Sequence, residues 1–153
     1  MFQVTLDTPI GRLLIEGTRD AVTAINVVPP DTQAVLRSGG APTMARRQLR
    51  EYFAGKRRLF DVPVSLDGTH FQRAVWTEIQ AVDFGSTTSY AELARRIHAP
   101  SAPRAVGRAN AANPVLIIVP CHRVLSTRGR LTGYRAGLAA KEWLLKHERA
   151  VMF

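Results

Sequence analysis

Residues 113–123 read Asn-Pro-Val-Leu-Ile-Ile-Val-Pro-Cys-His-Arg and contain the only cysteine of the chain, Cys121. The apolar run at 115–119 predicts a buried strand, and Pro120 suits its end because proline lacks a backbone N–H donor. A cysteine that served only packing would be expected inside the run, so its position after the run favours a displayed nucleophile. His122 and Arg123 would supply the base and the positive charge that a reactive thiolate needs.

Composition limits what the rest of the chain can be. The 153 residues suit one domain or two small ones, and 46% of them are hydrophobic, which is enough for a packed core. Because no apolar run is long enough to span a bilayer and the start lacks signal-peptide features, we expect a cytoplasmic protein, or a nuclear one in a eukaryote, with no membrane partner. One cysteine and four histidines without metal-ligand spacing predict no disulfide and no metal.

The net charge of +9 is unevenly distributed. Residues 93–141 contain no Asp or Glu. Their basic residues are Arg95, Arg96, Arg104, Arg108, Arg123, Arg128, Arg130, Arg135 and Lys141. An arginine-rich solvated face would give the same composition, but a block that surrounds the candidate nucleophile favours a surface that binds phosphate.

The first sixty residues predict a small α/β domain. Residues 2–6 and 12–16 alternate like the strands of a hairpin, and residues 21–28 predict a third strand. A loop rich in Pro, Gly and Ser follows at 29–42, and Thr43 is expected to cap a helix that Gly55 ends. Its predicted packing residues are Met44, Leu49, Tyr52 and Phe53. We place the division between two domains at 1–62 and 63–153.

The second domain is predicted to be mainly helical. Thr69 is expected to cap a helix whose core residues are Phe71, Val75, Trp76, Ile79 and Val82. Ser89 is expected to cap a short helix at 90–97, with Glu92 completing a capping box. A second short helix at 103–111 would make the pair a helix-turn-helix, and Arg104 and Arg108 fall on one face of it. A final amphipathic helix is expected at 138–149, with Trp143, Leu144 and Leu145 on its packing side.

Several motifs in order resemble the O6-alkylguanine-DNA alkyltransferases, also called methylated-DNA–protein-cysteine methyltransferases, over about residues 44–149. The motifs are Phe71-Gln72, Val75-Trp76, Ser89-Tyr90, Arg104-Ala-Val-Gly107, Asn113-Pro114, Pro120-Cys-His-Arg-Val124, Gly133-Tyr134 and residues 141–148. The resemblance implies an N-terminal α/β domain, ribonuclease H-like with a small sheet plus a helix, packed on a mainly α C-terminal domain with a helix-turn-helix.

The resemblance also implies a reaction. The protein would flip O6-alkylguanine out of duplex DNA and take the alkyl group irreversibly onto Cys121, once per molecule and with no cofactor. His122 would be the base that acts through a water, and Glu148 would orient it. Tyr90 would protonate the guanine ring as it leaves, and Asn113 would brace the active-site loop.

The resemblance assigns the remaining residues to base and DNA binding. Tyr134 would form a wall of the base pocket, and backbone groups of Cys121 and Val124 would read the guanine edge. Arg135 also falls at the pocket, where some members have a small hydroxyl residue, and Leu116 stands where some have proline, so the range of alkyl groups is left open. The DNA-binding residues in the minor groove would be Arg104, Arg108, Ala105, Gly107, Ser89 and Arg123, with Arg104 filling the place of the flipped base. Whether further copies of the protein bind beside it on DNA is also open.

Two other interpretations remain at this point. In the first, the protein is a helix-turn-helix DNA binder in which Cys121 is structural. In the second, Cys121, His122 and Glu148 form a cysteine hydrolase, although no motif for an oxyanion hole is evident. A branch of the resembled family that has lost the cysteine and only binds lesions is disfavoured by Cys121.

Overall fold

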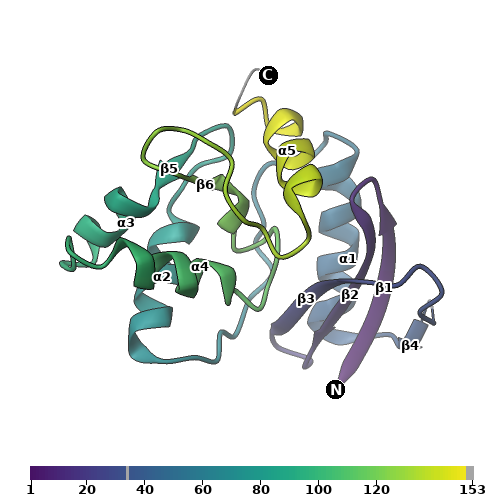
Figure 1. Ribbon diagram of the computed structural model, residues 1–153. Coiled ribbons are helices and arrows are strands. Elements are labelled where there is room, and N and C mark those ends of the chain that lie inside the picture. Colours follow the sequence, from purple (N-terminus) through teal and green to yellow (C-terminus); the bar gives the residue numbers. More distant parts are fainter. Residues whose placement is uncertain (34, 151–153) are drawn as a thin grey trace. The chain divides into compact units, whose positions relative to one another are not determined.

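The computed structural model describes residues 1–33 and 35–150 and divides the chain into two compact units (Figure 1). Unit 1 comprises Met1–Asp67 and Pro114–Leu116, and unit 2 comprises Gly68–Asn113 and Ile117–Phe153. The predicted division after residue 62 falls inside unit 1, because residues 63–65 pair with its sheet through Val22. Within the described residues, no helix is both long and apolar enough to cross a membrane.

Unit 1 is an antiparallel sheet with one helix. Its strands are β1 (Phe2–Thr8), β2 (Gly11–Gly17), β3 (Val22–Val28) and β4 (Val35–Arg37), in the order β3-β2-β1-β4. The three predicted strands are confirmed, and β4 lies in the segment predicted to be a loop. Three residues are too few to show an alternating pattern, so the sequence gives no signal for β4.

Helix α1 (Gly40–Phe53) covers the sheet and begins earlier than predicted. Its N-cap is Gly39, and Thr43 lies inside the helix, where its hydroxyl accepts a 2.7 Å hydrogen bond from the Gly39 N–H. Leu49 and Tyr52 are fully buried as predicted, whereas the prediction for Met44 is wrong because 42% of that residue is exposed. The helix ends as predicted, before Gly55 with its left-handed φ of 76°.

Unit 2 is built from α2 (His70–Gln80), α3 (Tyr90–Arg96), α4 (Pro103–Ala111) and α5 (Leu138–His147), with the two-residue parallel strands β5 (Thr88–Ser89) and β6 (Val124–Leu125). Thr69 caps α2 as predicted, in a capping box with Gln72. Trp76 is buried and its indole N–H donates to the Ala109 carbonyl at 2.8 Å. This bond fixes α2 against α4.

Helices α3 and α4 form the predicted helix-turn-helix, and α2 packs against both (Figure 1). Ser89 caps α3 through the Glu92 N–H, as predicted. The Glu92 carboxylate instead contacts Arg95 and Arg96, so the second half of the predicted capping box is wrong. Competition from these arginines, three and four residues along the helix, accounts for the difference.

The predicted strand at 115–119 is wrong. Only Val115 forms a bridge, to Ile25, whose N–H and carbonyl bond to Pro114 and Leu116. The chain then turns at residues 116–118, with Ile117 at a left-handed φ of 72°, which ends the extended path. Cys121 therefore does not end a strand but begins a short 3-10 helix, η1 (Cys121–Arg123).

Candidate active site

The Cys121 side chain is almost completely buried. The residue is 3% exposed, and burial raises the pKa of its thiol above the ordinary value. A hydrogen bond with Asn113 and the charges of Arg135 and Lys141 oppose that rise without cancelling it. The resting protein thus holds a neutral thiol, and the reaction must remove its proton.

His122 is the nearest base by sequence, and its hydrogen-bond partner indicates which ring nitrogen carries the proton. Its Nε2 lies 2.8 Å from Oε2 of Glu148, and both side chains are completely buried. Because a carboxylate only accepts hydrogen bonds, Nε2 carries the proton and the lone pair is on Nδ1. Nδ1 is buried and bonds to no other described residue. Burial lowers the pKa of His122, despite the opposing effect of Glu148, so the ring is a neutral proton acceptor.

Glu148 also forms an ion pair with Arg123. It directly follows α5, and its two oxygens receive hydrogen bonds of 2.7 and 3.0 Å from Nε and Nη2 of Arg123. Burial alone would raise the pKa of this carboxyl, but the hydrogen bonds and charges of His122 and Arg123 lower it to about 2. Glu148 therefore stays ionised and fixes the His122 ring.

The prediction that Arg123 binds DNA is wrong in this structure. The residue is only 6% exposed, and its guanidinium is engaged by Glu148 and, at 2.7 Å, by the carbonyl of Val82. Arg123 was predicted to face DNA because it belongs to the basic stretch at residues 93–141, but its side chain points into unit 2. Arg123 supports the His122–Glu148 pair instead of meeting phosphate.

Asn113 and Tyr90 both lie where hydrogen bonds fix them. The buried Asn113 donates from Nδ2 to the Val119 carbonyl at 2.8 Å, which braces the turn before Cys121. Tyr90 stands at the start of α3, and its hydroxyl lies 2.7 Å from Oγ1 of Thr132. The Thr132 carbonyl in turn accepts from the ammonium of Lys141 at 2.8 Å.

The three residues predicted for the base pocket differ in exposure. The Tyr134 ring lies edge-on to His122 at 6.3 Å, and burial raises the pKa of its hydroxyl well above the ordinary value. The N–H of Val124 bonds to the Cys121 carbonyl, and its own carbonyl accepts from Lys141 at 2.6 Å, so only a second lone pair of that carbonyl is left for a base. Arg135 is exposed.

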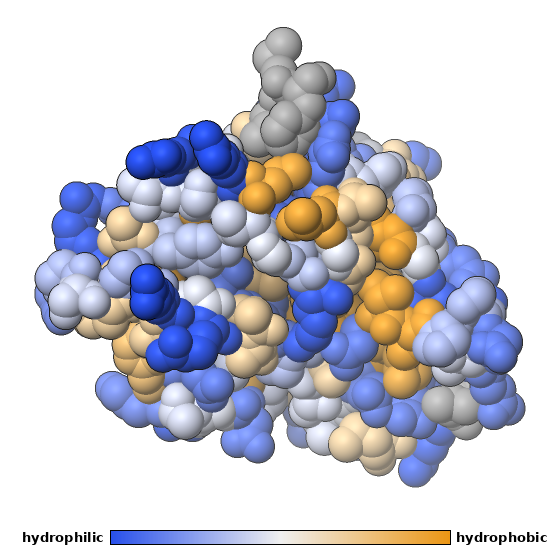
Figure 2. Space-filling view, in the orientation of Figure 1, coloured by the Kyte–Doolittle hydropathy of each residue, from blue (hydrophilic) through white to orange (hydrophobic). Residues whose placement is uncertain are grey.

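The predicted DNA-binding helix presents a basic face with small residues. Arg104 and Arg108 are exposed on α4, and Ala105 and Gly107 are half-buried. A methyl group added at Gly107 would meet the Tyr90 ring at 3.8 Å, an ordinary contact distance. In Figure 2, a few strongly hydrophilic residues lie among less polar ones over the part of the surface where α3 and α4 lie. Ser89 is half-buried, and its hydroxyl is engaged as the cap of α3.

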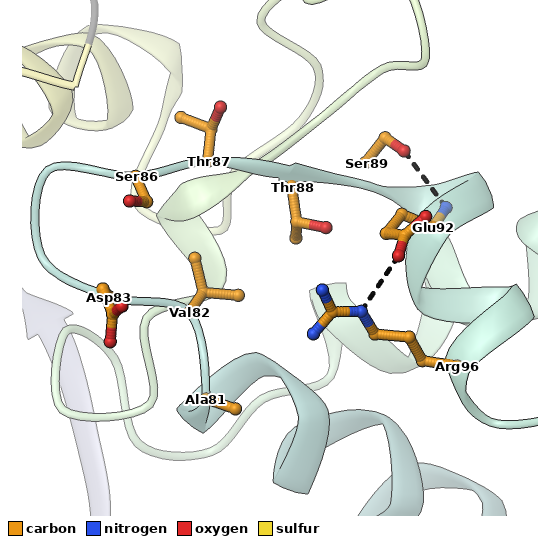
Figure 3. A pocket seen from close by; sticks show the side chains of 9 residues that line it. All are labelled: Ala81, Val82, Asp83, Ser86, Thr87, Thr88, Ser89, Glu92 and Arg96. Carbon is orange, nitrogen blue, oxygen red and sulfur yellow. Dashed lines mark hydrogen bonds and ion pairs between the residues drawn. The ribbon is translucent and has the colours of Figure 1, made fainter.

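A cavity of about 370 Å³ lies between the end of α2, the segment after it and α3 (Figure 3). It is lined by Ala81, Val82, Asp83, Ser86, Thr87, Thr88, Ser89, Glu92 and Arg96. Most of these side chains are polar, and neither Cys121 nor His122 is among them. The cavity is therefore separate from the thiol site.

Comparison with known proteins agrees with this arrangement. The family model described as 6-O-methylguanine DNA methyltransferase, DNA binding domain, matches residues 70–150, and the model of the ribonuclease-like domain of the same family matches residues 1–66. The chain belongs to the O6-methylguanine DNA methyltransferase family.

Relatives of this family match nearly the whole chain. The methylated-DNA–protein-cysteine methyltransferases of Methanosarcina mazei and Methanosarcina acetivorans are 52% and 40% identical, and both matches cover 97% of this chain and at least 97% of the relative. The crystal structure of Mycobacterium tuberculosis O6-methylguanine methyltransferase superposes with a TM-score of 0.85 at 42% identity, over 97% of this chain and 92% of that one. The structure of the M. tuberculosis protein in complex with DNA gives a TM-score of 0.88 at 41% identity, over 97% and 93%.

Sequence reasoning missed the buried role of Lys141 in this member of the family. Lys141 was counted with the surface arginines, yet it is fully buried, and burial lowers the pKa of its ammonium to about 8. A signal was available, because residues 141, 144, 145 and 148 fall on the inner face of one helix. Thr132 gave no such signal, since it lies in a segment without regular structure.

Proposed function

We propose that this protein repairs duplex DNA directly, by moving the methyl group of O6-methylguanine onto the sulfur of Cys121 in one irreversible turnover. The observation that carries the proposal is the buried Cys121 thiol, followed in the chain by a neutral His122 that Glu148 orients. The names of the two Methanosarcina relatives support the same reaction. A thioether has no easy route back to a thiol, so each molecule would act once.

The first step of the mechanism is loss of the thiol proton. Nδ1 of His122 accepts it, through a bridging water, while Glu148 stabilises the imidazolium that forms. The resting thiol and imidazole are both neutral, because burial disfavours the charged form of each. Asn113 stabilises the thiolate through its hydrogen bond with Cys121. The sulfur then attacks the methyl carbon in line with the carbon–oxygen bond.

The second requirement is a better leaving group. As the methyl carbon–oxygen bond breaks, Tyr90 donates its hydroxyl proton to the guanine ring, so guanine departs neutral. The phenolate and the imidazolium then return to their neutral forms by a proton shift. In balance, a thiol and O6-methylguanine give a methyl thioether and guanine. Tyr134 forms a wall of the base pocket, Arg135 lies at its rim, and Val124 reads the base through its backbone.

The DNA surface of the proposal is the exposed face of α4. Arg104 fills the space of the flipped base, Arg108 contacts phosphate, and the small Ala105 and Gly107 allow close approach in the minor groove. Extrusion of a base costs a few kcal/mol, which a stacking cation partly offsets. A cytoplasmic location is part of this proposal, and a lone cysteine, kept reduced inside a cell, supports it.

The test is the intact mass of the protein after incubation with a duplex that contains one O6-methylguanine. We expect a stoichiometric gain of about 14 Da, mapped to Cys121. Cys121→Ser should bind the duplex and gain no mass. Repeated turnover without a mass gain would instead support a hydrolase, and an unchanged mass with DNA binding would support the non-catalytic binder.

A further inference from the structure

Thr132 contacts Tyr90, the proton donor of the proposed reaction. It lies between β6 and α5 in unit 2, and its Oγ1 is 2.7 Å from the Tyr90 hydroxyl. At this distance the two hydroxyl groups form one hydrogen bond, in which either Thr132 donates to Tyr90 or Tyr90 donates to Thr132. The direction of that bond decides where the Tyr90 proton points.

Thr132 is itself held in place by a buried cation. The ammonium of Lys141 donates to the Thr132 carbonyl at 2.8 Å and to the Val124 carbonyl at 2.6 Å. Lys141 is fully buried on α5, so it ties the segment around Thr132 to β6. The hydrogen bond from Lys141 therefore anchors the backbone of Thr132, and this holds the Thr132 hydroxyl against Tyr90.

We propose that Thr132 is a positioning residue that acts on alkyl transfer through Tyr90. This inference rests on the proposed function, in which Tyr90 gives its proton to the leaving guanine. When Thr132 donates to the Tyr90 oxygen, the tyrosine proton is free to point toward the base. As that proton leaves, the oxygen becomes a phenolate, and a hydrogen bond from Thr132 to a charged acceptor is stronger than to a neutral one. Thr132 thus stabilises the transition state more than the resting state.

The experiment is a double-mutant cycle on single-turnover transfer from duplex O6-methylguanine, using Thr132→Val, Tyr90→Phe and the combination. Valine keeps the shape of threonine and removes its hydroxyl. We expect Thr132→Val to slow transfer about 10- to 100-fold, the range for loss of a hydrogen bond to a charged group, with the Kd for duplex DNA unchanged. In the Tyr90→Phe background the same change should slow transfer less than about twofold, because the hydroxyl it acts on is absent.

Two further variants separate this role from packing. Thr132→Ser keeps the hydroxyl and should retain a rate close to that of the wild type. Thr87→Val removes an exposed threonine of the same unit and should have no effect. Equal slowing by Thr132→Val with and without the Tyr90 hydroxyl, or equal slowing by valine and serine, would show a structural role only and overturn the inference. If wild-type protein transferred no methyl group, the proposed function itself would fail, and the inference with it.

Discussion

Glu148 accepts hydrogen bonds from two different side chains, and these bonds determine how a substitution of Glu148 should change the stability of the protein. Oε2 lies within hydrogen-bond distance of both His122 and Arg123, and Oε1 accepts from Arg123. Glu148→Gln would leave the buried Arg123 charge without a counter-ion. Breaking a buried pair in this way costs about 3–5 kcal/mol of unfolding free energy. Glu142→Gln, which disrupts only the exposed pair with Lys146, should cost less than about 0.5 kcal/mol in the same urea titration.

The pH dependence of that difference follows from the pKa of Glu148. Because the native pKa is lowered from 4.5 to about 2, the carboxylate contributes its stability above pH 4.5 and loses it as pH falls toward 2. The stability difference between wild type and Glu148→Gln should therefore be constant near neutral pH and narrow below pH 4.5. Urea titrations from pH 7 to 3 would measure it. A difference that stayed constant over this range would show that Glu148 is not ionised in the native pair.

His122 sets a second pH expectation, for reactivity instead of stability. Since burial lowers its pKa below 6.5, the imidazole stays neutral until the medium is more acidic than for an ordinary histidine. Single-turnover transfer should accordingly lose half of its rate at a pH below 6.5 as the base becomes protonated. An acid limb centred above 6.5 would exclude a neutral buried His122 as the proton acceptor.

Helix α4 contains a glycine, Gly107, that lowers the stability of the helix and lies on the face proposed to bind DNA. Gly107 lies in the middle of this helix, where alanine is more favourable by about 0.5–1 kcal/mol, and a methyl group there has room beside the Tyr90 ring at 3.8 Å. Gly107→Ala should raise the unfolding free energy by that amount and weaken duplex binding, because it thickens the face that enters the groove. The reverse change Ala105→Gly should lower stability. If affinity for DNA did not fall in Gly107→Ala, this face of α4 would not be the contact surface.

The elements also show where sequence patterns are informative. Helix α2 was predictable because Thr69 caps it and Val75 and Ile79 keep helical spacing along its buried side. The apolar run at 115–119 was not, because burial alone does not distinguish a strand from a buried turn, and Ile117 adopts a backbone conformation that isoleucine rarely takes. The side-chain network of Arg123 was missed for a related reason. Partners such as Val82, which is 41 residues away in the chain, leave no local signal.

For the whole molecule, the charge differs between the two parts of the chain. Residues 1–67 carry 9 Lys and Arg against 7 Asp and Glu, whereas residues 68–153 carry 12 against 5. Part of the second excess is buried, in Arg123 and Lys141, and does not face solvent. Arg104 and Arg108 on α4 are among the exposed arginines that remain, so we expect the salt dependence of DNA binding to come mainly from unit 2.

The salt dependence gives a quantitative test of this assignment. Each phosphate contact that is lost reduces the magnitude of the slope of log Kobs against log salt concentration by about 0.9, so Arg108→Gln should reduce it by about 0.9. A matched control, Arg47→Gln, removes the same charge from an exposed position on α1 and should leave the slope unchanged. Titrations of a fluorescent duplex between about 50 and 200 mM salt would measure both. Equal losses in the two variants would mean that net charge alone attracts DNA, whereas a loss confined to the α1 variant would move the DNA surface to unit 1. Only a loss confined to the α4 variant agrees with direct contact between Arg108 and phosphate.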